Sequence, residues 1–288
     1  MDEALRRRAA LTFASIATAL LVACTQPSSA QPPTTTTTPT VEPTRVVVTA
    51  TPSPAPTATP TPTPTATSTP RPVPSAGAPV REIDRGNLDR RELALTFDCG
   101  ATANNTAEIL AALRDADVHT TWFMIGDWVR AHPDLSREIA SRHEIASHSD
   151  THPDYVLMSD DQIAADLEAA DRTFQQVLGR SAKPMWRAAS GSRDARVLAA
   201  ATRAGWWQHI FWTLDRDANG LVTGDSGDWR DFTPQQVAAN MLRAAALGNG
   251  VITVSHCDSA QTRQVLPEVL RTLKEQGVRV TTVSDVLR

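Results

Sequence analysis

Two histidines four residues apart are the most chemically suggestive feature of the chain. They stand in the segment His148-Ser149-Asp150-Thr151-His152. On one turn of a helix both imidazoles would face the same way and could bind one metal ion. Two surface histidines without a function would have the same spacing. The pair alone therefore leaves both interpretations open.

Other residues able to bind a metal or carry a proton come at the ends of short apolar runs. They are Asp98, Arg187, His256 and Asp258. Asp98 and His256 can serve as a base and an acid. A single aspartate of this kind is often a helix cap, and a single histidine is often a hydrogen-bonded core residue. Together, at several run ends, they favour a reaction centre. We expect surface or structural roles for the remaining histidines, His119, His132, His143 and His209.

The elements that would position these residues alternate regularly. Short apolar runs predict buried strands at 93–97, 120–125, 144–146, 185–187, 207–214, 251–255 and 278–283. Apolar residues at helical spacing predict helices at 106–116, 133–142, 160–178, 193–204, 233–246 and 262–276. Strands that alternate with helices predict parallel pairing with right-handed crossovers. Six or seven such units favour a closed α/β barrel, in which the chemistry lies at the carboxyl ends of the strands.

Composition limits both the domain count and the function. Most of the 20 prolines precede Arg81, which leaves residues 81–288 as one globular domain large enough to bury a substantial core. Lys and Arg number 28 against 32 Asp and Glu, for a net charge of -4. The sequence shows no basic stripe and no glycine-rich phosphate loop. It therefore indicates no nucleic-acid partner, and it predicts no particular oligomeric state.

Residues 1–24 have the pattern of a targeting segment. Three arginines, Arg6 to Arg8, precede an apolar run, 9–23, that is too short to span a membrane comfortably. The run ends in Leu21-Val22-Ala23-Cys24, which resembles a bacterial lipobox. That resemblance implies that Cys24 is lipidated after cleavage; the alternative is an ordinary signal peptide that contains a cysteine. We expect an exported protein, held by its lipid on the outer side of the cytoplasmic membrane and facing the cell wall.

Residues 25–80 are dominated by Thr, Pro, Ala and Ser. Such a segment buries too little apolar surface to offset the entropy of ordering it. Proline-rich chains extend by about 3.1 Å per residue, so this one could span on the order of 100 Å. We expect a disordered spacer between the anchor and the globular domain. Its Thr-Pro repeats resemble O-glycosylated stalks.

Five motifs over about residues 90 to 288 resemble, in order, those of the polysaccharide deacetylases (carbohydrate esterase family four, the NodB-homology domain). They are Leu95-Thr96-Phe97-Asp98-Cys99-Gly100, His148-Ser149-Asp150-Thr151-His152-Pro153, Arg187-Ala188-Ala189-Ser190-Gly191, Asp225-Ser226-Gly227-Asp228-Trp229 and Val254-Ser255-His256. The resemblance implies a distorted (β/α) barrel of about seven parallel strands. It also implies a metal-dependent hydrolase that removes acetyl groups from N-acetylated sugars of a cell-wall or extracellular polysaccharide.

The resemblance assigns the proton carriers. Asp98 would be the general base and His256 the general acid. Arg187 would orient Asp98 and balance its charge. Asp228 would tune His256.

The resemblance also assigns the electrophilic groups and the pocket. His148 and His152 would hold a divalent metal, usually zinc, that activates water and polarises the carbonyl. The backbone N–H of Ser190 would help to bind the oxyanion. Trp229 would line the pocket for the acetyl methyl group.

Cys99 is the first departure from the family pattern, because it stands where the family has a second aspartate that binds the metal. It could be a thiolate ligand. It could form a disulfide with Cys257, which an exported location permits if the two Cα atoms lie within about 7 Å. It could also be inert, with water as the third ligand. The sequence leaves these alternatives open.

Two further departures concern the walls of the site. The third motif has lost its proline and its aromatic residue, which are Ala189 and Ser190 here. About ten extra residues, 216–224, precede the fourth motif and suggest a loop over the site. Three functions follow: an N-deacetylase, an O-acetyl esterase of the same fold (an acetylxylan esterase, for example), or an inactive carbohydrate-binding lipoprotein. The intact acid–base set favours an enzyme.

Overall fold

The computed structural model describes residues 82–215, 224–246 and 248–288. The predicted signal peptide 1–24, with its lipidation site Cys24, and the predicted linker 25–80 lie outside the described residues. So does the predicted loop 216–224, apart from Gly224.

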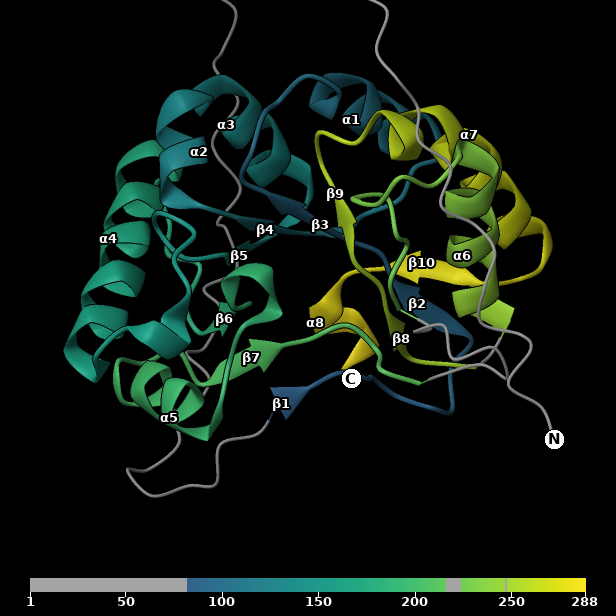
Figure 1. The fold of residues 1–288 in the computed structure, drawn as a ribbon. Coiled ribbons are helices and arrows are strands. Elements are labelled where there is room, and N and C mark those ends of the chain that lie inside the picture. The colour runs from purple at the N-terminus through teal and green to yellow at the C-terminus, as the bar shows by residue number, and fades with distance from the viewer. Residues whose placement is uncertain (1–81, 216–223, 247) are drawn as a thin grey trace, which may run out of the picture. The chain divides into compact units, whose positions relative to one another are not determined.

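Seven parallel strands form the main sheet, which curls like an incomplete barrel (Figure 1). From one edge to the other they are β1 (Glu82–Ile83), β7 (Gln208–Ile210), β6 (Met185–Trp186), β5 (Glu144–Ser147), β4 (Thr121–Met124), β3 (Thr96–Cys99) and β9 (Ser255–His256). The predicted distorted (β/α) barrel of about seven parallel strands is confirmed.

A second sheet of three parallel strands continues the wall of the barrel. Its strands, in order, are β10 (Arg279–Thr281), β2 (Glu92–Ala94) and β8 (Val251–Ile252). One residue separates β2 from β3, and two residues separate β8 from β9. The Thr253 N–H donates to the Ala94 carbonyl oxygen at 2.9 Å between these connections. The two segments therefore run together from one sheet into the other, and their carboxyl ends reach the same rim.

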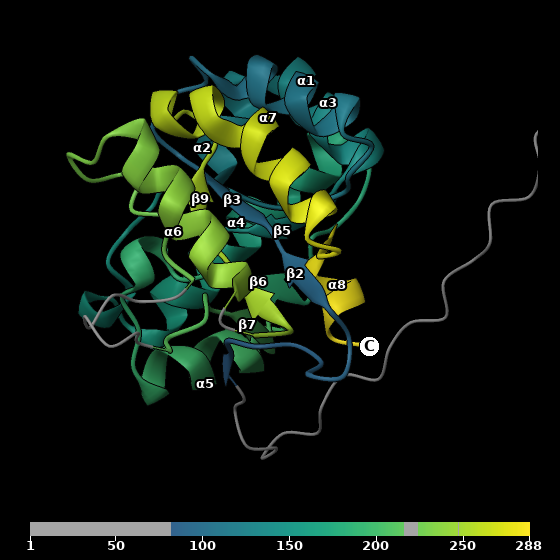
Figure 2. The same cartoon turned by 90° about the vertical axis from the view of Figure 1, so that its right-hand side faces the viewer.

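Seven helices of the described chain cover the outside of the sheets. They are α1 (Thr106–Asp115), α2 (Gly126–Ala131), α3 (Pro133–Arg142), α4 (Asp160–Leu178), α5 (Ala195–Arg203), α6 (Pro234–Ala246) and α7 (Ala260–Glu275). The short helix α8 (Val283–Val286) packs instead against the inner face of the main sheet, beside Phe123 and Ala146. Figure 2 shows α7 lying between α1 and α6, with which it is in contact. Among the described residues, no helix combines the length and apolar character that crossing a membrane would require.

The long helix α4 has the boundaries that its sequence predicts. The Ser159 side chain accepts from the Gln162 backbone N–H, and the Gln162 side chain accepts from the Ser159 N–H, which together form a capping box. Gly179 ends the helix with φ of 71°, in the left-handed region that glycine adopts at little cost. Local signals at both ends therefore specify this element.

Two of the predicted strands end earlier in the structure than the sequence suggested. The predicted strand 207–214 is shorter, because β7 ends at Ile210 and the Phe211 N–H donates to Ile83 on β1. The predicted strand 278–283 ends at Thr281. The next residue, Thr282, caps α8 by accepting from the Asp285 N–H.

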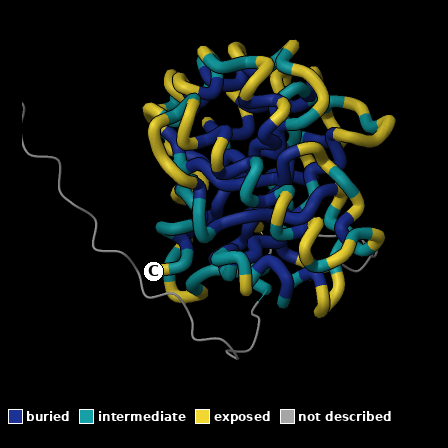
Figure 3. Tube along the Cα trace, turned by 90° about the vertical axis from the view of Figure 1, so that its left-hand side faces the viewer, coloured by how far each residue is buried: buried dark blue, intermediate teal, exposed yellow. Residues whose placement is uncertain are grey.

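Buried residues fill the interior of the barrel and the layer beneath the helices (Figure 3). The largest fully buried side chains include Trp122, Trp186 and Trp206. Arg187 is the exception among them, since it is charged and yet 0% exposed. A buried charge requires a partner, so Arg187 draws attention to the groups around it.

Candidate active site

One pocket of about 700 Å³ lies at the carboxyl rim of the main sheet. It is lined by several of the residues predicted from the motifs: Asp98, His148, His152, Ser190, Trp229 and His256. Arg187 and Asp228 lie behind it, buried against Asp98 and His256. Strand ends from distant parts of the chain therefore meet at one site.

Asp98 lies near the end of β3 and is an ionised carboxylate. Its Oδ1 accepts a hydrogen bond from Arg187 Nη1 at 2.7 Å. Burial by itself would raise the pKa of Asp98. The charge of Arg187, with help from the His256 imidazolium, outweighs it, so the pKa lies below its ordinary value. Asp98 can therefore accept a proton at neutral pH.

The Arg187 guanidinium is fixed from several sides. Its Nε donates to the Ile210 carbonyl oxygen at 3.1 Å, and its Nη1 also donates to Thr96 Oγ1 at 2.9 Å. The guanidinium carbon lies 3.9 Å from the centre of the Phe123 ring. These contacts hold the cation in place and thereby hold the carboxylate that pairs with it.

His256, at the end of β9, is a protonated imidazolium. Its Nδ1 lies 2.8 Å from Asp228 Oδ1, and its backbone N–H donates to Asp228 Oδ2 at 2.8 Å. Thr262 Oγ1 donates to the same Oδ2 at 2.6 Å. Burial alone would lower the pKa of His256, but Asp228, with help from Asp98 and Asp258, raises it to about 9. His256 therefore carries a proton that it can donate at neutral pH.

His148 and His152 follow β5 in a loop and not on a turn of helix. Ser149 and His152 have φ of 80° and 61°. This left-handed backbone, rather than a helix, brings the two rings to 5.0 Å between centroids. The close approach that the spacing suggested is present, although it has a different origin.

His148 is a neutral imidazole with a lone pair on the pocket side. Its Nδ1 lies 3.0 Å from the Arg187 carbonyl oxygen, which only accepts, so Nδ1 carries the hydrogen. Burial lowers the pKa of His148 to about 4, although Asp98 partly opposes this. Nε2 of His148 then presents a lone pair 3.6 Å from Asp98 Oδ2. Two acceptors therefore face each other across a short gap.

Cys99 is joined to Cys257 by a disulfide, and this corrects its assignment as a metal ligand. Only a thiolate binds a metal, and a sulfur in a disulfide is not a thiolate. Both cysteines are 0% exposed, and neither lines the pocket. Among the alternatives that the sequence left open, the structure contains the disulfide.

The donor set falls short of the usual catalytic zinc site. Such sites have three protein ligands and an open position. Across residues 82–215, 224–246 and 248–288, no three His, Cys, Asp or Glu side chains are grouped so that they could hold a metal ion. His148 and His152 supply two imidazoles without a third ligand. The residues present therefore do not fit a catalytic metal of this kind.

The turn Ala189–Gly191 forms another wall of the pocket. Ser190 has φ of 53° and Gly191 has φ of 67°. A Cβ on Gly191 would lie 2.9 Å from Cη2 of Trp212, so glycine lets the indole lie against the turn. Trp212 lines the pocket, but the motifs do not point to it. The signal that could have found it is its place just after β7, at the rim where the other site residues follow their strands.

Trp229, which follows Asp228, also lines the pocket and is 61% exposed. Its Nε1 donates to Asp225 Oδ1 at 3.3 Å, and the Arg230 guanidinium lies 4.5 Å from its ring. With Trp212 it gives the pocket two indoles. Aromatic faces of this kind suit the apolar faces of sugar rings.

Comparison with known proteins agrees with this geometry. The family model for polysaccharide deacetylase matches residues 85–208. A peptidoglycan-N-acetylglucosamine deacetylase from Bacillus cereus is 30% identical over 199 residues, covering 66% of this chain and 68% of that protein. A chitooligosaccharide deacetylase from Rhizobium leguminosarum bv. trifolii is 27% identical over 205 residues, covering 71% of this chain and 86% of that protein.

A solved structure of similar fold is that of BA3943 from Bacillus anthracis, described as a CE4 family pseudoenzyme. It has a TM-score of 0.64 and 26% sequence identity, over 73% of this chain and 69% of that chain. Fold, motifs and relatives agree. The chain belongs to the polysaccharide deacetylase family, the amide-cleaving hydrolases that its motifs predicted.

Proposed function

We propose that this protein removes acetyl groups from N-acetylated sugars of a cell-wall or extracellular polysaccharide. The observation that carries the proposal is the pairing of Asp98 with His256 on neighbouring strands at one pocket. One side chain is ionised and the other is protonated at neutral pH. Amide hydrolysis needs both, since a proton must leave the water and another must reach the amine.

The first step is attack of water on the acetyl carbonyl carbon. Nε2 of His148 and Oδ2 of Asp98 border the pocket 3.6 Å apart. Both accept, so they can orient a water molecule that donates to each. Asp98 takes one proton as the oxygen–carbon bond forms. The backbone N–H of Ser190, in the turn at the pocket wall, can stabilise the oxyanion.

The second step breaks the carbon–nitrogen bond. His256 donates its proton to the amine nitrogen, which then leaves, and acetate and a free amino sugar remain. Asp228 stabilises the imidazolium before this transfer. Polysaccharide deacetylases are generally metal-dependent, and zinc is the metal that the motifs imply. Because the described residues supply two imidazoles rather than three ligands, no step here is assigned to a metal.

The substrate class is inferred from the relatives and from the pocket. The relatives' names specify peptidoglycan and chitooligosaccharides, which share N-acetylglucosamine. Trp212 and Trp229 offer two indoles at the pocket. We infer that the protein acts on a polymer that contains this sugar.

The location that suits such a substrate is the outer side of the cytoplasmic membrane. The support is the lipobox-like sequence ending in Cys24, followed by the Thr/Pro-rich segment 25–80. A lipid on Cys24 would hold the protein at the membrane, and the spacer would let the domain reach the wall. This anchor is the membrane contact that we propose.

A second candidate function is carbohydrate binding without catalysis. It is favoured by the disulfide at the position of the family's metal-binding aspartate and by the incomplete donor set. The full-length protein should be incubated with peptidoglycan, chitooligosaccharides and acetylated xylan, and released acetate measured. Acetate from either of the first two supports the proposal. Acetate from xylan alone would indicate an O-acetyl esterase, and polymer binding without acetate would indicate the second candidate.

A further inference from the structure

The cysteines of the disulfide directly follow the two proton carriers. Cys99 comes after Asp98, and Cys257 comes after His256. We propose that the Cys99–Cys257 disulfide is a positioning element that sets the separation of base and acid. The proposal rests on the proposed function for the roles of Asp98 and His256.

Strand register places the disulfide directly beside the reacting pair. Asp98 and His256 are partners across β3 and β9, so Cys99 and Cys257 occupy the next rung. Their Cα atoms are 5.3 Å apart. The Cys257 N–H donates to the Asp98 carbonyl oxygen at 3.1 Å. The cross-link therefore lies one residue from each side chain whose position matters.

The strand that carries the acid is short, and side chains of other segments help to hold its backbone, as Asp228 does by accepting from the His256 N–H. β9 has two residues and lies at the edge of the main sheet, where β3 is its strand partner. A strand this short has few ladder hydrogen bonds. Side chains at the start of α1 add others, since Thr106 Oγ1 donates to the Cys257 carbonyl oxygen at 3.0 Å and Asn105 Nδ2 donates to the Asp258 carbonyl oxygen at 2.5 Å. The disulfide is the covalent member of this set.

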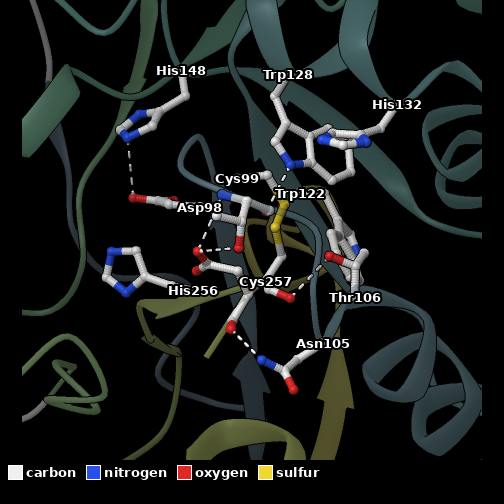
Figure 4. Close-up of a disulfide and its surroundings, with 12 residues drawn as sticks. Asp98, Cys99, Asn105, Thr106, Trp122, Trp128, His132, His148, His256 and Cys257 are labelled. Atoms are coloured by element: carbon white, nitrogen blue, oxygen red, sulfur yellow. Dashed lines mark hydrogen bonds and ion pairs between the residues drawn. A yellow bond between two sulfur atoms is a disulfide. The ribbon is translucent and has the colours of Figure 1, made fainter. Parts of the chain in front are cut away.

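The disulfide acts from the face opposite the pocket. Successive side chains of a strand point to opposite faces, so Cys99 points away from the pocket that Asp98 lines. Both cysteines belong to the hydrophobic core, with Trp122 and Trp128. Figure 4 shows the His148 ring directed at Asp98, and the two sulfurs on the side of those tryptophans. The disulfide cannot touch substrate, and its effect must pass through the backbone.

The expected effect is on turnover rather than on substrate binding. A misplacement of about 1 Å in a reacting group can cost about 10²-fold in rate. The pocket walls at Ser190, Trp212 and Trp229 lie on other segments. In full-length Cys99→Ala/Cys257→Ala, we expect kcat for acetate release to fall by about 10- to 100-fold, with KM within about twofold of wild type.

A stability control is needed because the disulfide also links residues 158 apart in the sequence and thus constrains the unfolded chain. Leu167→Ala, in the buried face of α4, removes core packing at a residue that does not line the pocket. All variants should be assayed well below their unfolding temperatures. We expect Leu167→Ala to keep kcat within about twofold of wild type, because the substitution leaves the acid–base pair unchanged.

Reduction of the disulfide provides a second test. Wild type that is unfolded, reduced and refolded should have a lower kcat and should regain it on reoxidation. The kcat of the double variant should not change with the same treatment.

Amide hydrogen exchange tests the same claim without activity. The N–H at position 257 donates to Asp98, and the His148 N–H donates to the Met124 carbonyl oxygen in the sheet interior. In the double variant the first should lose at least about tenfold more protection than the second. A double variant with unchanged kcat, and with the same loss of exchange protection at both amides, would overturn the proposal. If wild type releases no acetate but exchange changes as expected, the positioning holds and the proposed function fails.

Discussion

Asp98 and His256 are register partners on two adjacent parallel strands, β3 and β9. Each is completed by a buried partner from another part of the chain: Arg187 for the aspartate and Asp228 for the histidine. These two ion pairs have opposite polarity. One keeps the carboxylate ionised, and the other keeps the imidazole protonated. Acid and base in one pocket are thereby set to the states that amide hydrolysis requires.

Removing either proton carrier should abolish most of the activity. We expect Asp98→Asn and His256→Gln each to lower kcat for acetate release by about 10²- to 10⁴-fold, the usual contribution of general acid–base catalysis. His119→Gln, at an exposed histidine, is the matched control and should retain wild-type kcat. Near-normal turnover in both site variants would rule out the assigned roles.

Asp228 should set the alkaline limit of activity. His256 must be protonated to act, and its pKa is raised to about 9, so wild-type kcat should hold at neutral pH and decline as pH rises through 9. In Asp228→Asn the carboxylate that raises the pKa is gone, while burial still lowers it. We expect the alkaline limb to move down by more than about one pH unit. A pH–rate profile with an unmoved limb would contradict this.

The buried pair of Asp98 and Arg187 should couple strongly in stability. Arg187→Met leaves a buried carboxylate without its cation, which should cost about 3–5 kcal/mol of unfolding free energy. Asp98→Asn/Arg187→Met removes both charges. It should lower the unfolding free energy by less than the sum of the losses in the two single variants. Urea unfolding of the four proteins measures the coupling. Additive costs would indicate that the ion pair contributes little.

Zinc should bind weakly, because three protein ligands are not assembled among the described residues. A ligand at ten times its Kd stabilises the folded state by about 1.4 kcal/mol, which raises Tm by about 3–6 °C in a domain of this size. We expect that zinc at ten times the Kd of an ordinary catalytic zinc site will raise the Tm of this protein by less than about 1 °C. His148→Ala/His152→Ala shows whether any shift comes from this pocket. A large shift that this variant abolishes would show that a third ligand is recruited.

Cys24 should determine the membrane location. We expect Cys24→Ala to move the protein from the membrane fraction to the soluble exported fraction, because lipidation requires that thiol. The catalytic domain should keep its kcat, since the substitution lies outside it. Fractionation followed by immunoblotting measures the change. Retention in the membrane would point to a different anchor.

Local signals allowed much of the fold to be predicted. Helix α4 carries a capping box, an apolar face and a terminal glycine, so both of its ends can be found from sequence. Strand β1 carries no such signal, because two residues become a strand only through pairing with β7. Helix α2 has six residues, too few for a clear helical period.

Most of the residues of the site could be predicted from the sequence, but the backbone geometry and the disulfide that hold them could not. Asp98, Arg187 and His256 could be predicted because each lies at or next to the carboxyl end of a strand. The spacing of His148 and His152 is the same in a helix and in the left-handed loop that the structure contains. The Cys99–Cys257 disulfide depended on a distance between strand ends that sequence does not supply. Trp212 was hidden because the predicted strand 207–214 ran through it.

The central claim is that Asp98 activates water and His256 protonates the amine in cleavage of an N-acetyl group. The most direct measurement is hydrolysis of a chitooligosaccharide by the full-length protein in heavy-oxygen water, following labelled acetate and free amino groups together. The account predicts one labelled acetate per free amine with wild type, and almost none with Asp98→Asn or His256→Gln. Absence of product with wild type, or equal labelled product with the variants, would contradict it.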